Sequence, residues 1–315
     1  MGNTIFFGGF TMIYDVIILG SGPAGLSAAV YAQRARLHTL VIEEKPLSGG
    51  QILDTYEVDN YPGLPGISGF ELGQKFRAHA DQLGAEFRIA QVVSIENLGD
   101  QKQVCTSEGT YQTRTLILAT GARHRKLMVP GEEKLTGMGV SYCATCDGAF
   151  FRGKTVAVVG GGDVALEDAL FLARGCEKVY LIHRREEFRG AAILQERVKQ
   201  TENIELILNS TVKEIFGENQ VTSVRICNKI EDTEQELQVE GMFIAVGIEP
   251  NAAAANGLVE QNEQGYIVAG EDTKTSVSGI FAAGDVRTKQ LRQVITAAAD
   301  GANAITSVQQ YLSGS

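Results

Sequence analysis

Two glycine-rich segments, each placed between an apolar run and a helical stretch, constrain the fold of this chain most. Residues 20–25 (GSGPAG) follow the apolar, β-branched run 14–19, and residues 160–165 (GGGDVA) follow the run 155–159. A continuous apolar run of this length is typical of a buried parallel strand, and glycines after it allow a tight turn into a helix. The chain is therefore predicted to contain two βαβ units of the kind that bind dinucleotides.

The first glycine turn has the full dinucleotide-binding pattern. Its backbone N–H groups, together with the start of a helix predicted over residues 26–36, would stabilise a pyrophosphate. The residues expected at this group are Gly20, Gly22, Pro23, Ala24 and Gly25. A glycine turn alone is common, but here a strand precedes it, a helix follows it and acidic residues come about 20 positions later. We therefore interpret it as a nucleotide site.

The residues that follow the next strand of each unit differ in charge. The acidic pair is Glu43 and Glu44, and the basic set is His183, Arg184, Arg185 and Arg189. An acidic side chain at this place accepts hydrogen bonds from an unmodified ribose diol, whereas guanidinium groups pair with a 2′-phosphate. A solvated strand end and a solvated charge run are the alternatives. The contrast favours two different dinucleotides, with NADPH preferred over NADH in the second unit.

Cys143 and Cys146 lie between the two turns, separated by two residues. Two cysteines at this spacing can close a small strained ring that is readily reduced and re-formed. Half of a zinc site is one alternative, although the other cysteines are single and no histidines pair in a ligand motif. Inert buried thiols are another. Asp147 could carry the proton that each exchange step requires, or could be a turn residue. The arrangement suggests electrons moving from NADPH through a flavin to a disulfide.

The composition excludes several classes of partner. The chain has 315 residues, of which 44% are hydrophobic, and a formal net charge of −10. Nucleic acid and anionic membranes attract cationic faces, so neither is expected as a partner. The five cysteines are odd in number and mostly scattered, unlike a secreted disulfide framework.

The N-terminal apolar stretch 4–20 is not interpreted as a signal peptide. It lacks a basic segment, Asp15 interrupts it, and it contains the start of the first glycine turn. No other run approaches the ~20 apolar residues of a membrane span. We therefore expect a soluble cytoplasmic protein, in which the residues before Met12 lie outside the first strand.

The order of the predicted elements places one domain inside another. A strand over residues 279–283 and a helix over 291–311 supply the pieces that the first unit lacks. We therefore expect an α/β fold of two Rossmann-like, three-layer domains, with residues 123–247 inserted in a discontinuous domain of residues 1–122 and 248–315. The other predicted elements are strands over 39–42, 115–119, 179–182, 203–208, 220–226 and 241–246, a helix over 71–83, and a turn-rich binding loop over 48–69.

The motifs and their order resemble those of the low-molecular-weight bacterial thioredoxin reductases over nearly the whole chain. The matching segments are residues 20–25, 49–51, 60–63, 119–121, 143–148, 160–165, 183–189, 284–285 and 292–293. The resemblance implies FAD in the discontinuous domain, NADPH in the inserted domain, and a homodimer. The extra N-terminal residues depart from the usual start of the family but touch no motif.

The resemblance also implies roles for single residues. Cys146 would lie against the flavin and accept its electrons, Cys143 would attack the substrate disulfide, and Asp147 would act as general acid or base. Asp285 would bind the ribityl chain of FAD. Further FAD contacts are expected from Gly50, Gln51, Asn60, Gly121, Gly284, Arg292, Gln293 and Val294. NADPH contacts are expected from Gly160, Gly162, Asp163, Ala165, His183, Arg184, Arg185 and Arg189.

The resulting prediction is a thioredoxin-disulfide reductase that passes electrons from NADPH to FAD, to the Cys143/Cys146 disulfide and then to thioredoxin or a thioredoxin-like dithiol protein. Reduction of another dithiol carrier, glutaredoxin-like or peroxidase-linked, is one alternative, and a redox-sensing nucleotide-binding module is another. Because the dithiol and the NADPH turn share one segment, they cannot easily reach the flavin in the same pose. We expect alternating domain orientations with hinges near residues 122–123 and 247–248. The basic residues 123–126 could dock an acidic protein or be a solvated linker.

Overall fold

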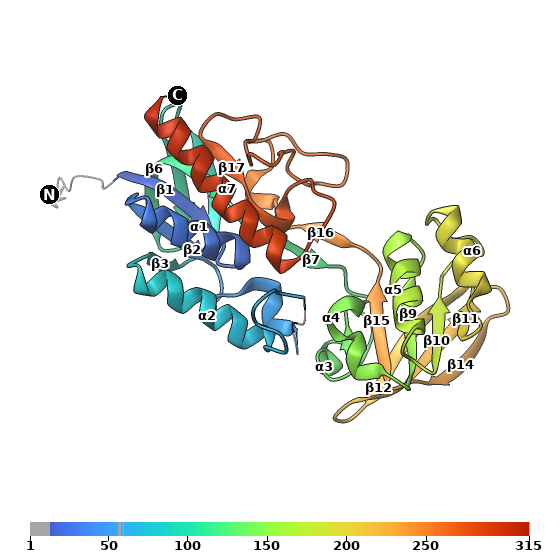
Figure 1. Ribbon diagram of the computed structural model, residues 1–315. Coiled ribbons are helices and arrows are strands. Elements are labelled where there is room, and N and C mark those ends of the chain that lie inside the picture. The colour runs from blue at the N-terminus through green and yellow to red at the C-terminus, as the bar shows by residue number, and fades with distance from the viewer. Residues whose placement is uncertain (1–12, 56–57, 59, 315) are drawn as a thin grey trace, which may run out of the picture. The chain divides into compact units, whose positions relative to one another are not determined.

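The computed structural model describes the backbone of residues 13–55, 58 and 60–314 (Figure 1). The expectation about the residues before Met12, and part of the predicted loop 48–69, therefore lie outside the described residues. Contacts divide the chain into two compact units. Unit 1 holds the described residues up to Ile52, Glu71–Ala122, and those from Pro250 onward; unit 2 holds the described residues of Leu53–Phe70 and Arg123–Glu249.

Unit 1 is built on one mixed sheet. Its parallel strands are β3 (Glu86–Ile89), β2 (Thr39–Glu43), β1 (Ile13–Leu19), β6 (Gly109–Leu118) and β17 (Ile280–Ala282). Two antiparallel strands, β5 (Lys102–Thr106) and β4 (Val92–Asn97), extend the sheet from the first half of β6, while β17 pairs with its second half. The C-terminal strand therefore joins the same sheet as β1, although more than 200 residues separate them.

Two long helices, α1 (Pro23–Arg34) and α7 (Val294–Ser313), cover one face of this sheet, and α2 (Gly69–Gln82) follows the binding loop (Figure 1). The opposite face is covered by residues 252–277, which include the short helix η3 (Ala253–Ala255), and by the short helix η4 (Gly284–Val286) after β17. A further short helix, η1 (Gly50–Asp54), lies in the predicted loop. Unit 1 therefore buries both faces of β1, of β2 and of the second half of β6, as their apolar runs predict.

The boundaries of the helices differ from the sequence-based predictions, most at the starts of the first and last helices. The first helix begins at Pro23, inside the glycine turn, and ends at Arg34, because proline suits the first helical position and Arg36 adopts a positive φ of 57°. The last helix begins at Val294 instead of 291. Gln293 precedes the helix and forms a capping box with Thr296. The loop therefore ends, and the helix begins, directly after Gln293.

Unit 2 is built on a parallel five-stranded sheet. In spatial order its strands are β11 (Ile204–Ile207), β10 (Lys178–Ile182), β9 (Thr155–Gly160), β15 (Gly241–Ala245) and β8 (Val140–Ser141). Helices α5 (Asp163–Ala173) and α6 (Ala192–Gln200) cover one face. An antiparallel sheet of β12 (Ser210–Gly217), β13 (Val221–Asn228) and β14 (Thr233–Gln238) covers the other. Short helices α3 (Glu132–Leu135), α4 (Ala144–Asp147) and η2 (Gly148–Phe151) precede β9.

The two stretches of chain that connect the units run as paired strands. These are β7 (Ala122–His124) and β16 (Ile248–Pro250), and the backbone N of Arg125 donates to the carbonyl oxygen of Gly247 at 2.9 Å. The basic residues of this stretch are engaged with carboxylates. Arg123 pairs with Glu249 at 2.5 Å and Lys126 with Glu133 at 3.4 Å, so the local excess of positive charge that a docking surface would need is reduced.

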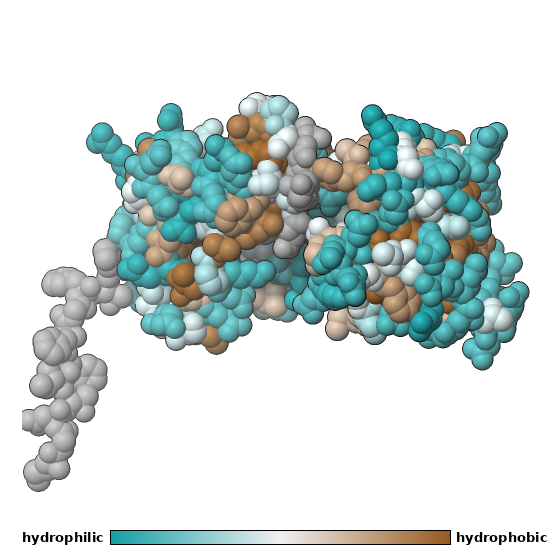
Figure 2. Space-filling view, turned by 90° about the horizontal axis from the view of Figure 1, so that it is seen from below, coloured by the Kyte–Doolittle hydropathy of each residue, from teal (hydrophilic) through white to brown (hydrophobic). Residues whose placement is uncertain are grey.

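Figure 2 shows one face on which hydrophilic residues prevail and hydrophobic residues gather in small groups. Among the described residues, no helix has both the length and the apolar character needed to cross a membrane.

Candidate active site

The first glycine turn connects β1 to α1 and packs closely on its own backbone. Gly20 has a φ of 100°, which glycine adopts without strain. A Cβ atom on Gly25 would come within 1.9 Å of the carbonyl oxygen of Gly20, so only glycine lets the helix begin this close to the strand. Pro23 opens the helix and Ala24 is buried behind it. The turn therefore has the shape and the helix N-terminus that a pyrophosphate requires.

The two acidic residues after the second strand differ in their surroundings. One oxygen of the Glu43 carboxylate accepts hydrogen bonds from the backbone N and the Oγ of Ser21, both at 2.7 Å. The other accepts from the backbone N of Lys45 at 3.0 Å. Glu44 lies beyond the end of β2 and is exposed. Glu43 is therefore the residue of the pair that is held at the glycine turn.

Four more of the predicted flavin contacts lie in loops. A Cβ atom on Gly50 would come 3.3 Å from the Cα of Gly22, so these two turns lie against each other. Gln51 follows in η1 and is partly buried, and Gly121 has a φ of 68° directly before β7. Asn60 is exposed and belongs to unit 2. Three of the four thus share a unit with the first turn.

A buried charge cluster joins Asp300 of α7 to Arg287 and Lys289 of the loop that carries most of the remaining predicted flavin contacts. The Asp300 carboxylate accepts hydrogen bonds from the backbone N of Gly284 at 2.9 Å, from Arg287 at 2.6 and 2.9 Å, and from Lys289 at 3.0 Å. Burial acts to raise the pKa of Asp300, but the bonds from Arg287 and Lys289 outweigh it and lower that pKa. Asp300 therefore fixes the turn at Gly284 as a charged anchor. No motif marked it in the sequence.

Asp285 and Arg292 each present a buried polar atom toward this region. Asp285 Oδ1 and Arg292 Nε have no hydrogen-bond partner in the part of the chain that the structure describes. Burial raises the pKa of Asp285. Gly284 packs on the first turn, since a Cβ atom there would come 2.9 Å from that of Ala24. An open acceptor and an open donor next to a glycine turn fit the hydroxyls and phosphates of FAD.

The second glycine turn repeats the plan of the first. Gly160 ends β9, and a Cβ atom on it would come 2.6 Å from that of Ala165, so the helix again starts close to the strand. Gly162 precedes α5, and a Cβ atom there would meet none of the described atoms within 4 Å. The N-terminus of α5 therefore has open space beside it, which fits a dinucleotide pyrophosphate.

The basic loop after β10 folds back onto this turn through two hydrogen bonds. The backbone N of Arg189 donates to the carbonyl oxygen of Gly161 at 2.7 Å, and the backbone N of Ala191 donates to Asp163 Oδ1 at 2.6 Å. Asp163 was predicted as a cofactor contact. In the structure one oxygen of its carboxylate accepts a hydrogen bond from the far end of the loop that carries the arginines.

The His183 side chain is buried against the second glycine turn. A Cβ atom on Gly161 would come 2.1 Å from the His183 ring, whose Nε2 lies 3.1 Å from the carbonyl oxygen of Glu187. Burial lowers the pKa of His183, so its ring supports the glycine turn as a neutral group. The exposed members of the predicted basic set are Arg184, Arg185 and Arg189. Exposed guanidinium groups on a loop anchored to the turn fit the 2′-phosphate of NADPH.

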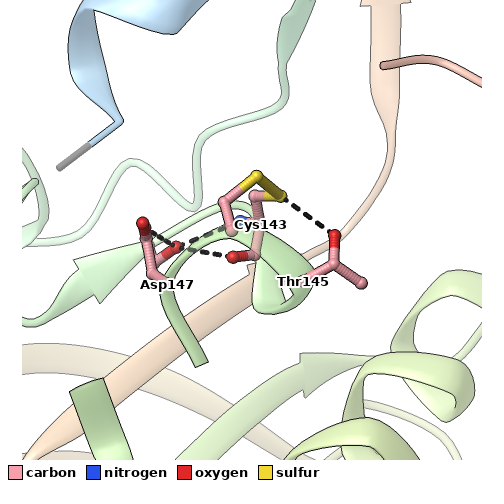
Figure 3. The surroundings of a disulfide bond; sticks show 5 residues. Cys143, Thr145 and Asp147 are labelled. Atoms are coloured by element: carbon pink, nitrogen blue, oxygen red, sulfur yellow. Dashed lines mark hydrogen bonds between the residues drawn. A yellow bond between two sulfur atoms is a disulfide. The ribbon is translucent and has the colours of Figure 1, made fainter. Parts of the chain in front are cut away.

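The two cysteines of the predicted redox pair are joined. Cys143 and Cys146 form a disulfide with their Cα atoms 5.3 Å apart (Figure 3). Cys143 directly precedes the four-residue helix α4, and its carbonyl oxygen accepts from the backbone N of Asp147 at 3.1 Å. The Oγ1 of Thr145 lies 3.4 Å from the sulfur of Cys143. Of the two disulfide sulfurs, that of Cys143 therefore lies beside a hydroxyl group.

Asp147 lies on the same turn as the disulfide (Figure 3). Its Oδ2 accepts a hydrogen bond from Ser141 Oγ at 2.6 Å, while its Oδ1 is buried with no partner among the described residues. Burial raises the pKa of Asp147, and the bond from Ser141 opposes that rise. A carboxyl group in this state suits proton transfer at a dithiol. Ser141 was missed from the sequence, because it lies two residues before Cys143 and outside any motif.

The other cysteines show no redox pairing. Cys105 and Cys227 are partly exposed free thiols, and Cys176 is buried. Burial raises the pKa of Cys176 to about 11, so its reactive thiolate is scarce at neutral pH. Within the described ranges, no group of three or more His, Cys, Asp or Glu residues could hold a metal ion.

Comparisons with known proteins identify the family of the chain. The family model for pyridine nucleotide-disulphide oxidoreductases matches residues 14–301. The chain is 46% identical to the thioredoxin reductase of Listeria innocua, over 95% of this chain and 94% of that protein. It is also 46% identical to a bifunctional thioredoxin reductase/thioredoxin of Mycobacterium leprae, over 95% of this chain and 66% of that protein.

The structural comparison covers both units. The crystal structure of the thioredoxin reductase from Streptococcus pyogenes matches with a TM-score of 0.91 and 43% identity, over 97% of this chain and 100% of that one. The predicted α/β fold of two Rossmann-like domains is thereby confirmed. The chain belongs to the thioredoxin reductases of the pyridine nucleotide-disulphide oxidoreductase family, an enzyme class that uses FAD and NADPH as its cofactors.

Proposed function

We propose that this chain reduces the disulfide of thioredoxin with electrons from NADPH. The observation that carries the proposal is the Cys143–Cys146 disulfide next to Asp147, in the unit whose glycine turn bears exposed arginines. The relative from Mycobacterium leprae, whose name joins a thioredoxin reductase to a thioredoxin, supports thioredoxin as the carrier.

Each cofactor is assigned to one domain. FAD belongs to residues 1–122 and 248–315, where Glu43 braces the first turn and Asp285 and Arg292 present open polar atoms. NADPH belongs to residues 123–247, where Arg184 and Arg185 would pair with the 2′-phosphate. When bound, FAD accepts two electrons from NADPH and supplies them to the disulfide.

The dithiol then transfers two electrons to the carrier without a net change in protons. One enzyme thiol gives its proton to Asp147 and attacks the carrier disulfide, and the carrier thiolate that leaves takes a proton from Asp147. The second enzyme thiol displaces the remaining carrier sulfur, which leaves with the second proton, and the Cys143–Cys146 bond re-forms. The sequence-based assignment gives the first attack to Cys143, and the hydroxyl of Thr145 beside its sulfur supports a thiolate there.

Two domain orientations complete the proposal. The dithiol and the basic glycine turn both lie in residues 123–247, so nicotinamide and Cys146 must take turns at the flavin. The paired strands β7 and β16 contain the two connections, near residues 122–123 and 247–248, about which the inserted domain would rotate.

The surroundings of the enzyme follow from the same reasoning. We propose a cytoplasmic homodimer, with neither nucleic acid nor membrane as a partner. The three cysteines outside the redox pair are free thiols, which suits a reducing compartment. The net charge of −10 disfavours polyanions as partners. Light scattering of the purified protein at several concentrations would test the dimer.

Anaerobic titration of the FAD-loaded protein tests the central proposal. NADPH should bleach the flavin absorbance, and later addition of oxidised thioredoxin should restore it with the appearance of carrier thiols. NADH and a glutaredoxin serve as the matched comparisons. A flavin that NADPH does not bleach would contradict the donor, and restoration by the glutaredoxin alone would replace thioredoxin with another carrier.

A further inference from the structure

We propose that Ser141 is a positioning residue for thiol–disulfide exchange, whose hydroxyl holds the Asp147 carboxyl next to the dithiol and directs the proton to one of its two oxygens. This inference rests on the proposed function, in which Asp147 carries the proton. Ser141 ends β8, the edge strand of the unit 2 sheet, and its side chain is buried. The chain reaches the disulfide two residues later.

The Ser141 hydroxyl lies among three polar atoms. Its Oγ is 2.6 Å from Asp147 Oδ2, 3.0 Å from the backbone N of Cys143 and 3.3 Å from the carbonyl oxygen of Cys143. A hydroxyl has one hydrogen to donate. The carboxylate is the closer acceptor and the charged one, so the hydrogen goes to Asp147. The oxygen lone pairs accept from the Cys143 N–H, and one side chain thereby joins the acid to the redox loop.

This arrangement makes the two carboxyl oxygens unequal. Oδ2 is occupied by the serine, whereas Oδ1 is buried and meets no partner among the residues described. Oδ1 is therefore the atom that takes the proton of the attacking thiol and returns it to the leaving carrier thiolate. Ser141 itself transfers no proton. The bond it donates also stabilises the carboxylate form, which lowers the pKa of Asp147 against the rise that burial causes.

Ser141 is the neutral hydrogen-bond partner of Asp147, and the charged side chains nearby lie on the elements that pack against α4. Helix α5 packs on α4 and carries Glu167, which is exposed, and Asp168, which is half-buried. Neither β8 nor η2 carries an acidic or basic side chain. Loss of the Ser141 hydroxyl therefore leaves burial as the remaining influence on the Asp147 carboxyl, and burial raises its pKa.

Replacement of Ser141 by alanine tests this role in the FAD-loaded enzyme. The protein is first reduced, then mixed with oxidised thioredoxin, and the single-turnover rate is followed from pH 5 to pH 9. Ser141→Ala should slow this step by about tenfold, as expected for loss of a hydrogen bond to a charged group. The part of the pH profile that reports the titration of Asp147 should move to higher pH, because loss of the Ser141 hydrogen bond raises the pKa of Asp147. Ser141→Thr keeps the hydroxyl and should retain the wild-type profile.

A double-variant comparison separates positioning from a general loss of structure. Asp147→Asn should slow the exchange step more than Ser141→Ala, and adding Ser141→Ala to it should cause no further loss, because both changes act through one carboxyl. Flavin reduction by NADPH should remain normal in all variants. Ser141→Gly provides a second variant without the hydroxyl if the alanine variant folds poorly.

The outcomes distinguish this inference from the proposed function. An unmoved pH profile in Ser141→Ala, losses that multiply in the double variant, or full activity in Asp147→Asn would each overturn the role of Ser141. If the wild-type enzyme itself failed to reduce thioredoxin, the proposed function would be contradicted instead.

Discussion

Helices α1 and α5 follow glycine turns of the same plan, but their other neighbours differ. Helix α1 is covered by α7, where a Cβ atom on Gly301 would come within 2.1 Å of the carbonyl oxygen of Ala24. Helix α5 meets the shorter helices α4 and α6. The sixth residue of α1 is the fully buried Ala28, whereas the sixth residue of α5 is the half-buried Asp168. The shared turn determines where a phosphate can bind, whereas the residues in the rest of each helix follow the packing of their own unit.

The side chains that follow β2 in unit 1 and β10 in unit 2 also differ between the units. In unit 1, Glu43 turns inward and bonds Ser21 of the glycine turn. In unit 2, the loop as a whole is bonded to its turn through Asp163, and Arg184 and Arg185 point into solvent. Because both glycine turns lie between a strand and a helix, we expect cofactor selectivity to depend on the side chains that the following loop presents. Each prediction below changes one side of this comparison.

The largest effect is expected at the dithiol, which only unit 2 contains. Cys143→Ser and Cys146→Ser should each reduce steady-state thioredoxin reduction by at least about a thousandfold, because each residue belongs to one chemical unit. Flavin reduction by NADPH should survive in both, since it needs unit 1 and the basic loop alone. Stopped-flow absorbance measures the flavin step, and thiol titration measures the carrier step.

The two single-cysteine variants also test which sulfur attacks. The assignment of the attack to Cys143 predicts that Cys146→Ser forms a stable mixed disulfide with thioredoxin. Mass spectrometry of the non-reduced mixture detects it. If Cys143→Ser formed the mixed disulfide instead, the two roles would have to be exchanged.

The next effect is expected at the exposed arginines. The combined change Arg184→Ala and Arg185→Ala should raise the KM for NADPH by about a hundredfold, because each charge-assisted bond to a phosphate contributes about tenfold in affinity. The KM for NADH, which lacks the 2′-phosphate, should stay the same. Initial rates with both nucleotides give the ratio. An equal rise for NADPH and NADH would show that the loop is not selective.

A smaller effect is expected at the anchor of that loop. Asp163→Ala removes the acceptor of the Ala191 N–H and should raise the KM for NADPH by about tenfold, since a lost hydrogen bond to a charged group frees the loop. Asp163→Asn keeps an acceptor oxygen and is the matched control, with a KM near that of the wild type. Direct phosphate binding by Asp163 is disfavoured by like charge, so a large loss in the asparagine variant would contradict the anchoring role.

The backbone plan was predictable because its signals are local. Largely apolar runs such as 14–19 and 155–159 suit strands that are mostly buried, and the positive φ of Gly20 favours glycine there. Strands β4 and β5 were missed, since much of β4 is exposed and its apolar pattern is weak. The spacing of the cysteines favoured a redox pair over half of a zinc site or inert thiols, and the structure joins them in a disulfide.

The missed parts of the site depend on contacts between distant residues. Asp300 meets Gly284 only after α7 has packed against the sheet, and no sequence spacing predicts that distance. The same holds for the His183 ring, which was predicted as a cofactor contact and which the structure places against Gly161. A residue type at a motif position indicates the available chemistry. The direction of its side chain is decided by packing.

The smallest effect is expected at Asp168, the residue that most clearly separates α5 from α1. Burial, with a contribution from Glu167, raises the pKa of Asp168 from 3.8 to about 7. The folded state therefore binds this proton more tightly than the unfolded state does, so the stabilisation is complete below about pH 4 and is lost as the pH rises through about 7.

Asp168→Asn removes this dependence. Urea unfolding of the FAD-loaded protein should show the variant gaining about 1 kcal/mol over the wild type between pH 5 and pH 8, because a partly exposed carboxyl keeps part of its hydration. The exposed neighbour Glu167→Gln is the control and should change little. A difference between Asp168→Asn and wild type that is independent of pH would show that α5 tolerates this carboxylate as readily as solvent does.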